Sequence, residues 1–469
     1  MKFHLIGICG TGMGSLAGLL LRAGHTVRGS DEHVYPPMST QLAALGIPVF
    51  EGFRAENLNW GPDLVVVGNV CRKDHVEVVE AQRRGLELTS FPAVLSRFFL
   101  AEKHSLVVAG THGKTTTSSL TSFVLYHAGR DPSFLIGGVP IDFGQGWRLG
   151  SGPDFVVEGD EYDTAFFDKG SKFLHYRPQT AILTSVEFDH ADIFANLDAV
   201  KAAFAAFVRL IPAEGRLVVA ASSPHALDVA QQARCPVITY GLGDAANADF
   251  TGEVERGSDG TQILNVRSHG HLLGTVTTRL LGRHNAENIL GVIAAVTSLG
   301  VPFEVAAEGV RRFSGVKRRQ EVRGVARGVT VIDDFAHHPT AVRLTLEGLR
   351  AAYGTSRLVA VFEPRSATSR RKVFQQEYAH AFDDADEVLL APLHAPEKVP
   401  VEERLDVERL AADLASRGKK ARVVPTVDAM VDILASLQDG AVVVVMSSGG
   451  FGGIHEKILA RLRGEPPAP

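Results

Sequence analysis

Short apolar runs alternate with amphipathic segments along most of the chain, and this pattern is typical of β-strands connected by helices. At the start of the chain, a strand is predicted at 3–8, a glycine-bounded turn and helix at 9–24, and a second strand at 25–31. Further strands are predicted at 62–69 and 85–90. Because strand, helix and strand in this order form a βαβ unit, the segment predicts an open parallel sheet.

The alternation restarts twice. A helix and connector at 91–105 close the first set, and a second set of strands is predicted at 105–110, 154–160, 180–186 and 216–221. A third set follows the segment 313–321, with strands at 329–336, 357–363, 386–392 and 441–448. These restarts predict an α/β protein of three domains, 1–101, 102–314 and 315–469.

One part of the second domain has a different period. Residues 249–281 alternate polar and apolar positions, as in "TQILNVRS", and this predicts a small antiparallel insertion. A helix is predicted directly afterwards, at 285–300.

Composition agrees with a soluble α/β protein. The chain has 469 residues, and about 150 residues per domain gives three domains. Its formal net charge of −5 offers no general surface for nucleic acid. Cys9, Cys71 and Cys235 are too widely spaced for a zinc site or a disulfide framework, which indicates a reducing cytoplasm. No apolar run approaches the ~18 residues that span a bilayer, so no membrane partner is expected.

The segment "GTHGKTTT", 110–117, lies between a predicted strand and a predicted helix. Glycines allow backbone N–H groups to approach phosphate oxygens, Lys114 supplies a positive charge, and the Thr115 hydroxyl can bind a metal ion. The spacing is shorter than that of the eight-residue phosphate loop, and an ordinary turn with an exposed lysine is the alternative. We expect this loop to bind ATP through Gly110, Thr111, His112, Gly113, Lys114, Thr115 and Thr116.

Acidic side chains follow two buried strands of the same domain. "VVEGDEYD" contains Glu158, Asp160, Glu161 and Asp163, and "TSVEFDHAD" contains Glu187, Asp189, His190 and Asp192. A triphosphate requires a divalent cation, and open α/β sheets bind ligands at the carboxyl ends of their strands. The clusters therefore indicate a Mg²⁺ site, with a solvated acidic loop as the alternative for any single residue.

The first glycine loop, "GICGTGMG", is followed by Asp31. It resembles a dinucleotide fingerprint, in which a carboxylate meets a ribose, but its glycines are out of register with GxGxxG. A nucleotide-linked substrate is thus preferred to a redox cofactor.

The segment "GRHNAENILG" begins a helix. Asparagine is a poor helix former, so Asn285 and Asn288 near a helix start require capping or a ligand. Capping explains Asn285, whereas Asn288, one turn further on, is interpreted as an amide that reads an adenine edge.

Together these motifs resemble the Mur ligases, ATP-dependent amide-forming enzymes of cell-wall peptidoglycan. "GTHGKTTT", "EGDEYD", "DHAD", "GRHNAENIL", "GVKRRQE" and "DDFAHHPT" occur in the family's order over nearly the whole chain. The resemblance implies a Rossmann-like N-terminal domain, a central ATPase domain with a phosphate loop, and a Rossmann-like C-terminal domain. It also implies an acyl phosphate intermediate made from ATP with Mg²⁺.

The resemblance further implies roles for individual residues. Lys114, Glu158, His190 and His337 are the expected catalytic residues, with Thr115, Glu158 and His190 holding metal. His284, Asn285 and Asn288 are expected to hold adenine and Asp334 the ribose, while Arg319 approaches the phosphates when the third domain closes. The UDP-substrate is expected at Gly10, Thr11, Gly12, Met13 and Asp31. Without the family match, a basic surface residue is an equally good interpretation of Arg319, and a residue at the start of a helix is an equally good interpretation of His337.

Three segments, 34–40, 362–371 and 447–457, resemble the branch that joins UDP-N-acetylmuramate to the murein tripeptide L-alanyl-γ-D-glutamyl-meso-diaminopimelate. His337, Arg365, Arg370 and Arg371 are the residues expected to bind this acidic acceptor. Members that add L-alanine typically show "PHR" where this chain has Pro364, Arg365 and Ser366.

Three other functions stay open at this point. An L-alanine ligase is distinguished by its acceptor. A nicotinamide-dependent oxidoreductase would leave Lys114, Thr115 and both acidic clusters unexplained. A nucleotide-binding regulator would bind ATP without releasing phosphate.

Overall fold

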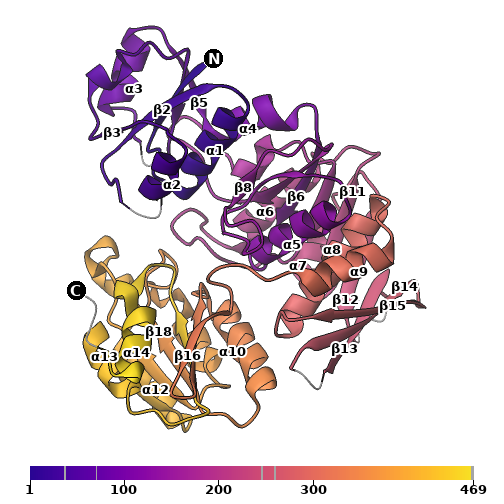
Figure 1. Cartoon of the computed structure of the whole chain (residues 1–469), viewed down its shortest axis with the longest axis vertical. Coiled ribbons are helices and arrows are strands. Elements are labelled where there is room, and N and C mark those ends of the chain that lie inside the picture. The colour runs from indigo at the N-terminus through magenta and orange to yellow at the C-terminus, as the bar shows by residue number, and fades with distance from the viewer. Residues whose placement is uncertain (36–37, 70, 244–246, 258–259, 466–469) are drawn as a thin grey trace.

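The computed structural model describes residues 1–35, 38–69, 71–243, 247–257 and 260–465. Three sheets follow one another along the chain, and Figure 1 shows them as three bodies, from the indigo N-terminal body through the central one to the yellow C-terminal one. Each apolar run predicted as a strand lies in one of these sheets. Of the segment 34–40, Pro36 and Pro37 lie outside the described residues.

The N-terminal sheet is parallel throughout, in the order β3-β2-β1-β4-β5. Its strands are β1 (Lys2–Ile6), β2 (Thr26–Asp31), β3 (Val49–Glu51), β4 (Leu64–Val67) and β5 (Glu87–Ser90). Its helices are α1 (Thr11–Arg22), α2 (Met38–Ala44), α3 (Val76–Arg83) and α4 (Phe91–Leu95). The loop after β1 lies where the strand order reverses, which is the usual ligand position in such a sheet.

The central sheet has the order β15-β14-β13-β12-β11-β10-β6-β9-β7-β8. Its strands are β6 (His104–Ala109), β7 (Ser133–Leu135), β8 (Trp147–Arg148), β9 (Asp154–Gly159), β10 (Thr180–Leu183), β11 (Arg216–Ala220), β12 (Val237–Leu242), β13 (Phe250–Arg256), β14 (Gln262–Ser268) and β15 (His271–Thr278). Its helices are α5 (Lys114–His127), α6 (Leu197–Val208), α7 (Pro224–Ala230), α8 (Arg283–Ser298) and α9 (Phe303–Arg312). Because β6 pairs in parallel with both β9 and β10, the loops that leave these three strands meet at one edge.

The insertion at 249–281 is antiparallel, as expected, through β13, β14 and β15. It is not separate from the domain, because β13 pairs in parallel with β12 and so continues the central sheet.

The C-terminal sheet has the order β16-β17-β21-β18-β19-β20, parallel except for β16. Its strands are β16 (Glu321–Ala326), β17 (Val329–Asp334), β18 (Leu358–Phe362), β19 (Glu387–Leu390), β20 (Lys420–Val423) and β21 (Val442–Met446). Its helices are α10 (Pro339–Tyr353), α11 (Gln375–Ala381), α12 (Val407–Ser416), α13 (Val427–Leu434) and α14 (Ile454–Arg463). The short helical turns of the chain are η1 (Ala55–Leu58), η2 (Ser96–Leu100), η3 (Lys172–His175), η4 (Lys372–Phe374), η5 (Pro396–Lys398), η6 (Val401–Glu403) and η7 (Phe451–Gly453).

Helix α1 packs directly on the central domain. A Cβ atom on Gly18 would lie 2.2 Å from Cζ2 of Trp147, whose side chain is buried. The same apolar cluster includes Leu16 of α1 and Val157 of β9. This shared core holds the first glycine loop in a fixed position relative to the central sheet.

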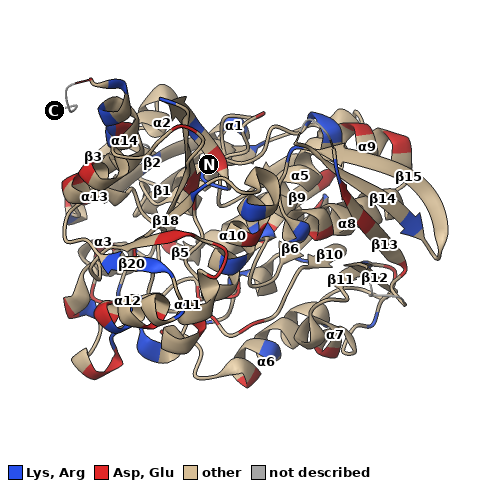
Figure 2. Ribbon diagram, turned by 90° about the horizontal axis from the view of Figure 1, so that it is seen from below, with Lys and Arg blue, Asp and Glu red and all other residues tan. Residues whose placement is uncertain are grey.

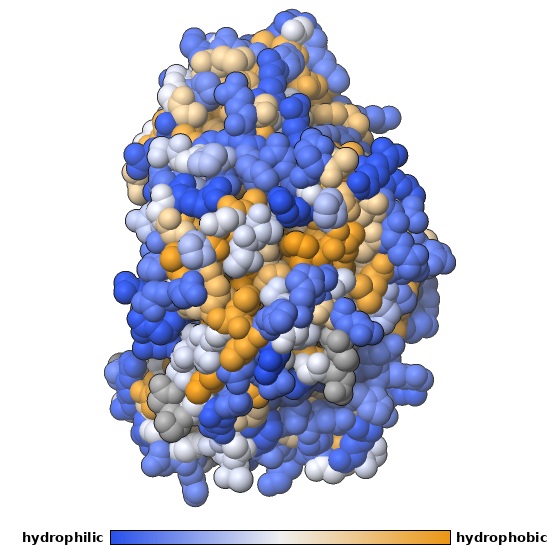
Figure 3. Space-filling model, turned by 90° about the vertical axis from the view of Figure 1, so that its right-hand side faces the viewer, coloured by the Kyte–Doolittle hydropathy of each residue, from blue (hydrophilic) through white to orange (hydrophobic). Residues whose placement is uncertain are grey.

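The surface mixes polar, charged and apolar side chains. Figure 2 shows Lys and Arg interspersed with Asp and Glu along the ribbon. In Figure 3, on the face that carries the central domain, apolar areas alternate with hydrophilic side chains. Among the described residues, no helix is both long and apolar enough to cross a bilayer.

Candidate active site

A cavity of about 500 Å³ lies at the edge where the loops after β6 and β10 meet. The start of α8 and residues of the C-terminal domain complete its lining, including Arg319 and Asp334. A cavity of this volume is in the range of small-molecule sites, ~300–1,000 Å³.

Two glycines shape the loop between β6 and α5. Gly110 has a φ of 139° and Gly113 a φ of 80°, conformations that favour glycine. A Cβ atom on Gly110 would lie 2.1 Å from the hydroxyl oxygen of Thr184, and one on Gly113 would lie 2.7 Å from Oδ1 of Asn288. Side chains at these positions would push the loop away from Thr184 and from Asn288 of α8. The loop leads directly into the N-terminus of α5, and a helix N-terminus attracts phosphate groups.

Lys114, the first residue of α5, is mostly withdrawn from water and is paired. Its ammonium donates to Oε2 of Glu161 at 2.9 Å and to the carbonyl oxygen of Gly110 at 2.7 Å. Burial alone would lower the pKa of Lys114, but the charges of Glu161 and Asp160 outweigh it and raise the pKa, so the side chain stays charged. Removing Glu161 alone would leave this charge unpaired, at a cost of about 3–5 kcal/mol.

Thr115 and Glu158 bring two oxygen ligands together. The Thr115 hydroxyl donates to Oε1 of Glu158 at 2.8 Å, and the Gly137 backbone N–H donates to Oε2 at 2.7 Å. Burial, with the nearby charge of Asp160, raises the pKa of Glu158. A hydroxyl and a carboxylate are oxygen ligands of the kind that fit a hard cation such as Mg²⁺.

His190 lies beside these residues but contacts a different carboxylate. Its Nε2 is 3.4 Å from Oε1 of Glu161, and its ring lies 5.3 Å from the ring of Tyr162. Burial would lower the pKa of His190, but the Glu161 hydrogen bond and charge raise it. His190 is therefore connected to Lys114 through Glu161, rather than directly to Thr115 and Glu158.

The start of α8 lies in the cavity. His284 is partly buried, and loss of contact with water, followed by the charges of His112 and Arg343, lowers its pKa to about 4, so its ring is neutral. The expectation that Asn285 caps this helix is wrong, because the cap residue is Gly282 and the Asn285 amide donates to the carbonyl oxygen of Leu281 at 2.8 Å. Asn288 lies against Gly113 of the phosphate loop.

Asp334 is buried at the end of β17. Its carboxylate accepts from the backbone N–H groups of Gln320 at 2.8 Å and Ala336 at 2.7 Å. Burial raises its pKa, and the charge of Arg319 partly offsets that increase. The carboxylate lines the cavity, where the resemblance places a ribose.

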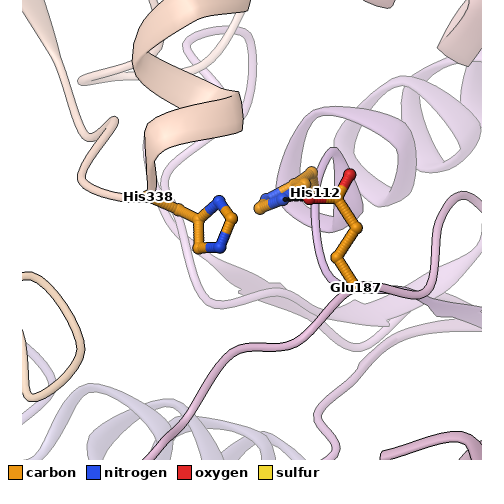
Figure 4. A group of neighbouring side chains, drawn as sticks. All are labelled: His112, Glu187 and His338. Atoms are coloured by element: carbon orange, nitrogen blue, oxygen red, sulfur yellow. Dashed lines mark hydrogen bonds and ion pairs between the residues drawn. The ribbon is translucent and has the colours of Figure 1, made fainter. Parts of the chain in front are cut away.

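A cluster that sequence reasoning did not assemble joins the central and C-terminal domains (Figure 4). The ligand atoms of His112, Glu187 and His338 lie within 4.8 Å of one another. The Glu187 carboxylate also accepts from the Thr340 hydroxyl at 2.8 Å. Of these three residues, only His112 and Glu187 were candidate site residues from the sequence, because both directly follow predicted strands of the central domain.

This cluster does not fit a metal ion. Nδ1 of His338 accepts from the Thr340 backbone N–H at 3.2 Å, and Nε2 lies 3.2 Å from the Phe188 carbonyl oxygen. Both ring nitrogens are thus occupied, so neither lone pair is free for a cation. His338 is instead the cap residue of α10 and a contact between domains.

His337, the preceding residue, is partly buried within the C-terminal domain. Its Nδ1 lies 3.0 Å from the Phe335 carbonyl oxygen, and its own carbonyl oxygen accepts from the Tyr378 hydroxyl. Burial lowers its pKa, so the imidazole is neutral near pH 7.

The three arginines expected to bind the acceptor differ in their surroundings. Arg371 pairs with Glu403, and Arg370 donates to backbone carbonyls, among them that of Ala395 at 3.1 Å. Arg365 lies against Gly449, with Nη1 3.6 Å from Oε1 of Glu363. Arg365 is therefore the least engaged of the three, and the structure does not bring Arg371 to an open site.

A second cavity, of about 530 Å³, lies at the first glycine loop. Gly10 and Asp31 line it, and the Asp31 carboxylate accepts from the Cys9 backbone N–H at 2.9 Å. Thr11, Gly12 and Met13 form the first turn of α1, but the Met13 side chain is buried in the core rather than exposed to this cavity.

Comparison with known proteins identifies the family to which the three domains are similar. Residues 2–103 match the Mur ligase family catalytic domain, residues 108–296 the Mur ligase middle domain, and residues 318–449 the Mur ligase glutamate ligase domain. The UDP-N-acetylmuramate–L-alanyl-γ-D-glutamyl-meso-2,6-diaminoheptandioate ligase of Escherichia coli (strain K12) is 41% identical over 472 residues, covering 98% of each chain.

Two solved structures resemble the whole chain. The murein peptide ligase from Psychrobacter arcticus 273-4 is 36% identical, with a TM-score of 0.72 and 100% of both chains covered. The UDP-N-acetylmuramate-alanine ligase from Thermotoga maritima is 25% identical, with a TM-score of 0.80 and 99% of both chains covered. Identity is higher for the peptide ligase and backbone similarity for the alanine ligase.

Proposed function

We propose that this chain, which belongs to the Mur ligase family and is an ATP-dependent ligase, joins UDP-N-acetylmuramate to the tripeptide L-alanyl-γ-D-glutamyl-meso-diaminopimelate. The observation that carries the choice of acceptor is the 41% identity over 98% of the chain to a ligase named for that tripeptide. The segment 362–371, which departs from the "PHR" of L-alanine ligases, supports the same choice.

In the proposed reaction, a carboxylate oxygen of the donor attacks the γ-phosphorus of ATP, and ADP leaves. The amine of the tripeptide then attacks the acyl carbon, and phosphate leaves with one former carboxylate oxygen. Activation is needed because a carboxylate is itself a poor acylating agent. Catalysis therefore depends on positioning and on charge stabilisation around the transferred phosphoryl group.

We assign that stabilisation to Lys114 and Arg319. The paired ammonium of Lys114 would face the phosphoryl oxygens, and the guanidinium of Arg319 lies 3.1 Å from the Thr115 hydroxyl, beside the same loop. Thr115 and Glu158 would hold Mg²⁺, which supplies further neutralisation of phosphate charge, and His190 would hold a second ion. The neutral ring of His337 would receive the proton lost by the attacking amine.

The remaining site residues follow the cavity. His284, Asn285 and Asn288 would contact adenine and Asp334 the ribose, and all four line the cavity. Gly110 through Thr116 would surround the phosphates, and His112, Gly113 and Thr116 of this loop line the cavity. Gly10 and Asp31, which line the second cavity, would bind the UDP-substrate together with Thr11 and Gly12 of the first turn of α1. For Met13 we propose only a packing role, because its side chain is buried. Arg365 is the preferred acceptor contact, with Arg370 and Arg371 orienting the loop that carries it.

We further propose that the three domains comprise residues 1–101, 102–314 and 315–469. We also propose that the enzyme acts in the cytoplasm, on small molecules rather than on nucleic acid or membrane. The free cysteines Cys9, Cys71 and Cys235 and the interspersed charges of Figure 2 support this setting.

The mechanism is tested by isotope transfer. When the donor carboxylate is labelled with ¹⁸O, mass spectrometry should find one ¹⁸O atom in each released phosphate. The amount of labelled phosphate should equal the amount of ligated product. Unlabelled phosphate with product formed would contradict the acyl phosphate, and no product would contradict the proposed function.

A further inference from the structure

The loop between β9 and β10 bridges the N-terminal and central domains. The Ser90 hydroxyl, at the end of β5, donates to Oδ2 of Asp168 at 3.0 Å. Phe166 packs against an apolar cluster of the N-terminal domain that includes Leu58 and Val65. The loop therefore connects the two domains, since it starts at the acidic residues after β9 and contacts the N-terminal domain through Phe166 and Asp168.

Lys172, further along this loop, lies beside two aromatic rings. Its ammonium lies 3.9 Å from the ring centroid of Tyr162 and 6.0 Å from that of Phe91. Tyr162 is the neighbour of His190, with ring centroids 5.3 Å apart. Phe91 lies against the first turn of α1, because a Cβ atom on Gly12 would be 3.6 Å from its ring. The ammonium thus lies between Tyr162, the neighbour of His190, and Phe91, the neighbour of Gly12.

The charge of Lys172 has no partner of its own. Within the described part of the chain, no oxygen forms a hydrogen bond or ion pair with its Nζ, whereas Lys114 pairs with Glu161 and Lys169 with Asp163. Burial lowers the pKa of Lys172, and the more distant charges of Asp160 and Asp163 oppose that effect. An ammonium that is partly withdrawn from water without a hydrogen-bond acceptor is costly unless a ligand supplies one.

We propose that Lys172 binds an anionic group of the donor substrate, either its diphosphate or its lactyl carboxylate. This inference rests on the proposed function, in which the donor has its nucleotide at the first glycine loop and its carboxylate at the phosphate loop. A molecule that spans these two sites passes the position of the Lys172 ammonium. The rings of Tyr162 and Phe91 hold the ammonium there, since aromatic faces attract cations.

The inference is tested by calorimetric titration of UDP-N-acetylmuramate, UDP-N-acetylglucosamine and UDP in the absence of ATP. Lys172→Met should weaken UDP-N-acetylmuramate binding about 10- to 100-fold, the loss typical of one charge-assisted hydrogen bond. Equal weakening for all three ligands identifies the diphosphate as the bound group. Weakening for UDP-N-acetylmuramate alone identifies the carboxylate.

Two variants separate charge from structure. Lys172→Arg keeps the positive charge and should recover most of the affinity. Lys169→Met removes an exposed lysine of the same loop and should bind like the wild type. If Lys172→Met binds all three ligands like the wild type and only melts at a lower temperature, Lys172 merely balances the acidic loop and the inference is wrong. If the wild type itself does not bind UDP-N-acetylmuramate, the proposed function fails, and the inference with it.

A measurement on the wild type covers the case in which the variant does not fold. Lysines are acetylated with and without saturating UDP-N-acetylmuramate, and peptides are quantified by mass spectrometry. Protection of Lys172 but not of Lys169 is the expected result. Equal labelling of Lys172 in both samples would overturn the inference.

Discussion

Nη2 of Arg319 donates to the hydroxyl oxygen of Thr115 at 3.1 Å, although the two residues are 204 positions apart in the sequence. The contact joins the start of the C-terminal domain to the phosphate loop. We expected Arg319 to reach this loop only on domain closure. In this structure it is already there, together with hydrogen bonds from Thr340 to Glu187 and from Thr368 to Asp189.

Replacing Arg319 should impair the chemical step. Its guanidinium is partly buried and positioned beside Thr115, so Arg319→Ala removes a preorganised charge from the phosphoryl group. We expect kcat to fall by about 10²- to 10³-fold in a phosphate-release assay, as for the loss of one such donor. Lys317→Ala, which changes an exposed lysine two positions earlier, should keep wild-type activity. A fall in kcat of less than threefold in Arg319→Ala would argue against the assigned role.

Glu158→Gln should raise the Mg²⁺ concentration needed for activity. The amide keeps the shape of the side chain, but it removes the negative charge that lies 2.8 Å from the Thr115 hydroxyl. A Mg²⁺ titration of phosphate release should shift to higher concentration and reach a lower plateau. Asp163→Asn is the control, because Asp163 pairs with exposed Lys169. An unchanged titration in Glu158→Gln would place the cation elsewhere.

The Glu187 carboxylate should make a pH-dependent contribution to stability. Burial would raise its pKa, but hydrogen bonding and charge from His112 lower it to about 2. A pKa that is lower in the folded than in the unfolded chain stabilises the fold above the unfolded value of 4.5, and this contribution is lost as the pH falls from there towards 2.

The measurement is the urea midpoint of the wild type minus that of Glu187→Gln. This difference should be positive at pH 7, decrease below about pH 4.5 and approach zero near pH 2. The exposed Glu253 on β13 supplies the matched variant, Glu253→Gln, for which no such trend is expected. A difference for Glu187→Gln that is independent of pH would contradict the assigned contact.

Gly348→Ala should hinder docking of the C-terminal domain. Gly348 lies inside α10, and an added Cβ atom would be 2.9 Å from Cα of Gly282, which is backbone of the central domain. Alanine is preferred to glycine inside a helix by about 1 kcal/mol, so the isolated helix would gain stability. We expect lower kcat/KM and a larger radius of gyration in X-ray scattering. Wild-type activity with an unchanged radius would show that the glycine contact is dispensable.

Much of the architecture was predictable because the signal was local. β6, β9 and β10 are continuous apolar runs with a motif directly after each, and parallel pairing at the sheet centre brings the motifs to one edge. By contrast, β12 was not predicted. It is partly exposed, contains Gly241, and depends on pairing with β13, which no local pattern reveals.

The sequence predicted which residues lie in the candidate site better than it predicted which contacts they make. The start of α8 was misjudged because Gly282, with a φ of 91°, sets it. His338 carried no ligand signal, since its role depends on Phe188, 150 positions away. Arg371 looked like a substrate contact because Glu403, its partner, lies in another loop. Each of these outcomes depends on tertiary contacts that a single sequence does not display.

The central claim is the identity of the acceptor. The most direct measurement is kcat/KM for phosphate release from ATP and Mg²⁺ with UDP-N-acetylmuramate, comparing L-alanine with L-alanyl-γ-D-glutamyl-meso-diaminopimelate and identifying products by mass. We predict release with the tripeptide and none above background with L-alanine. Release with L-alanine alone would contradict the claim and make this chain an L-alanine ligase, while release with neither would remove the proposed function altogether.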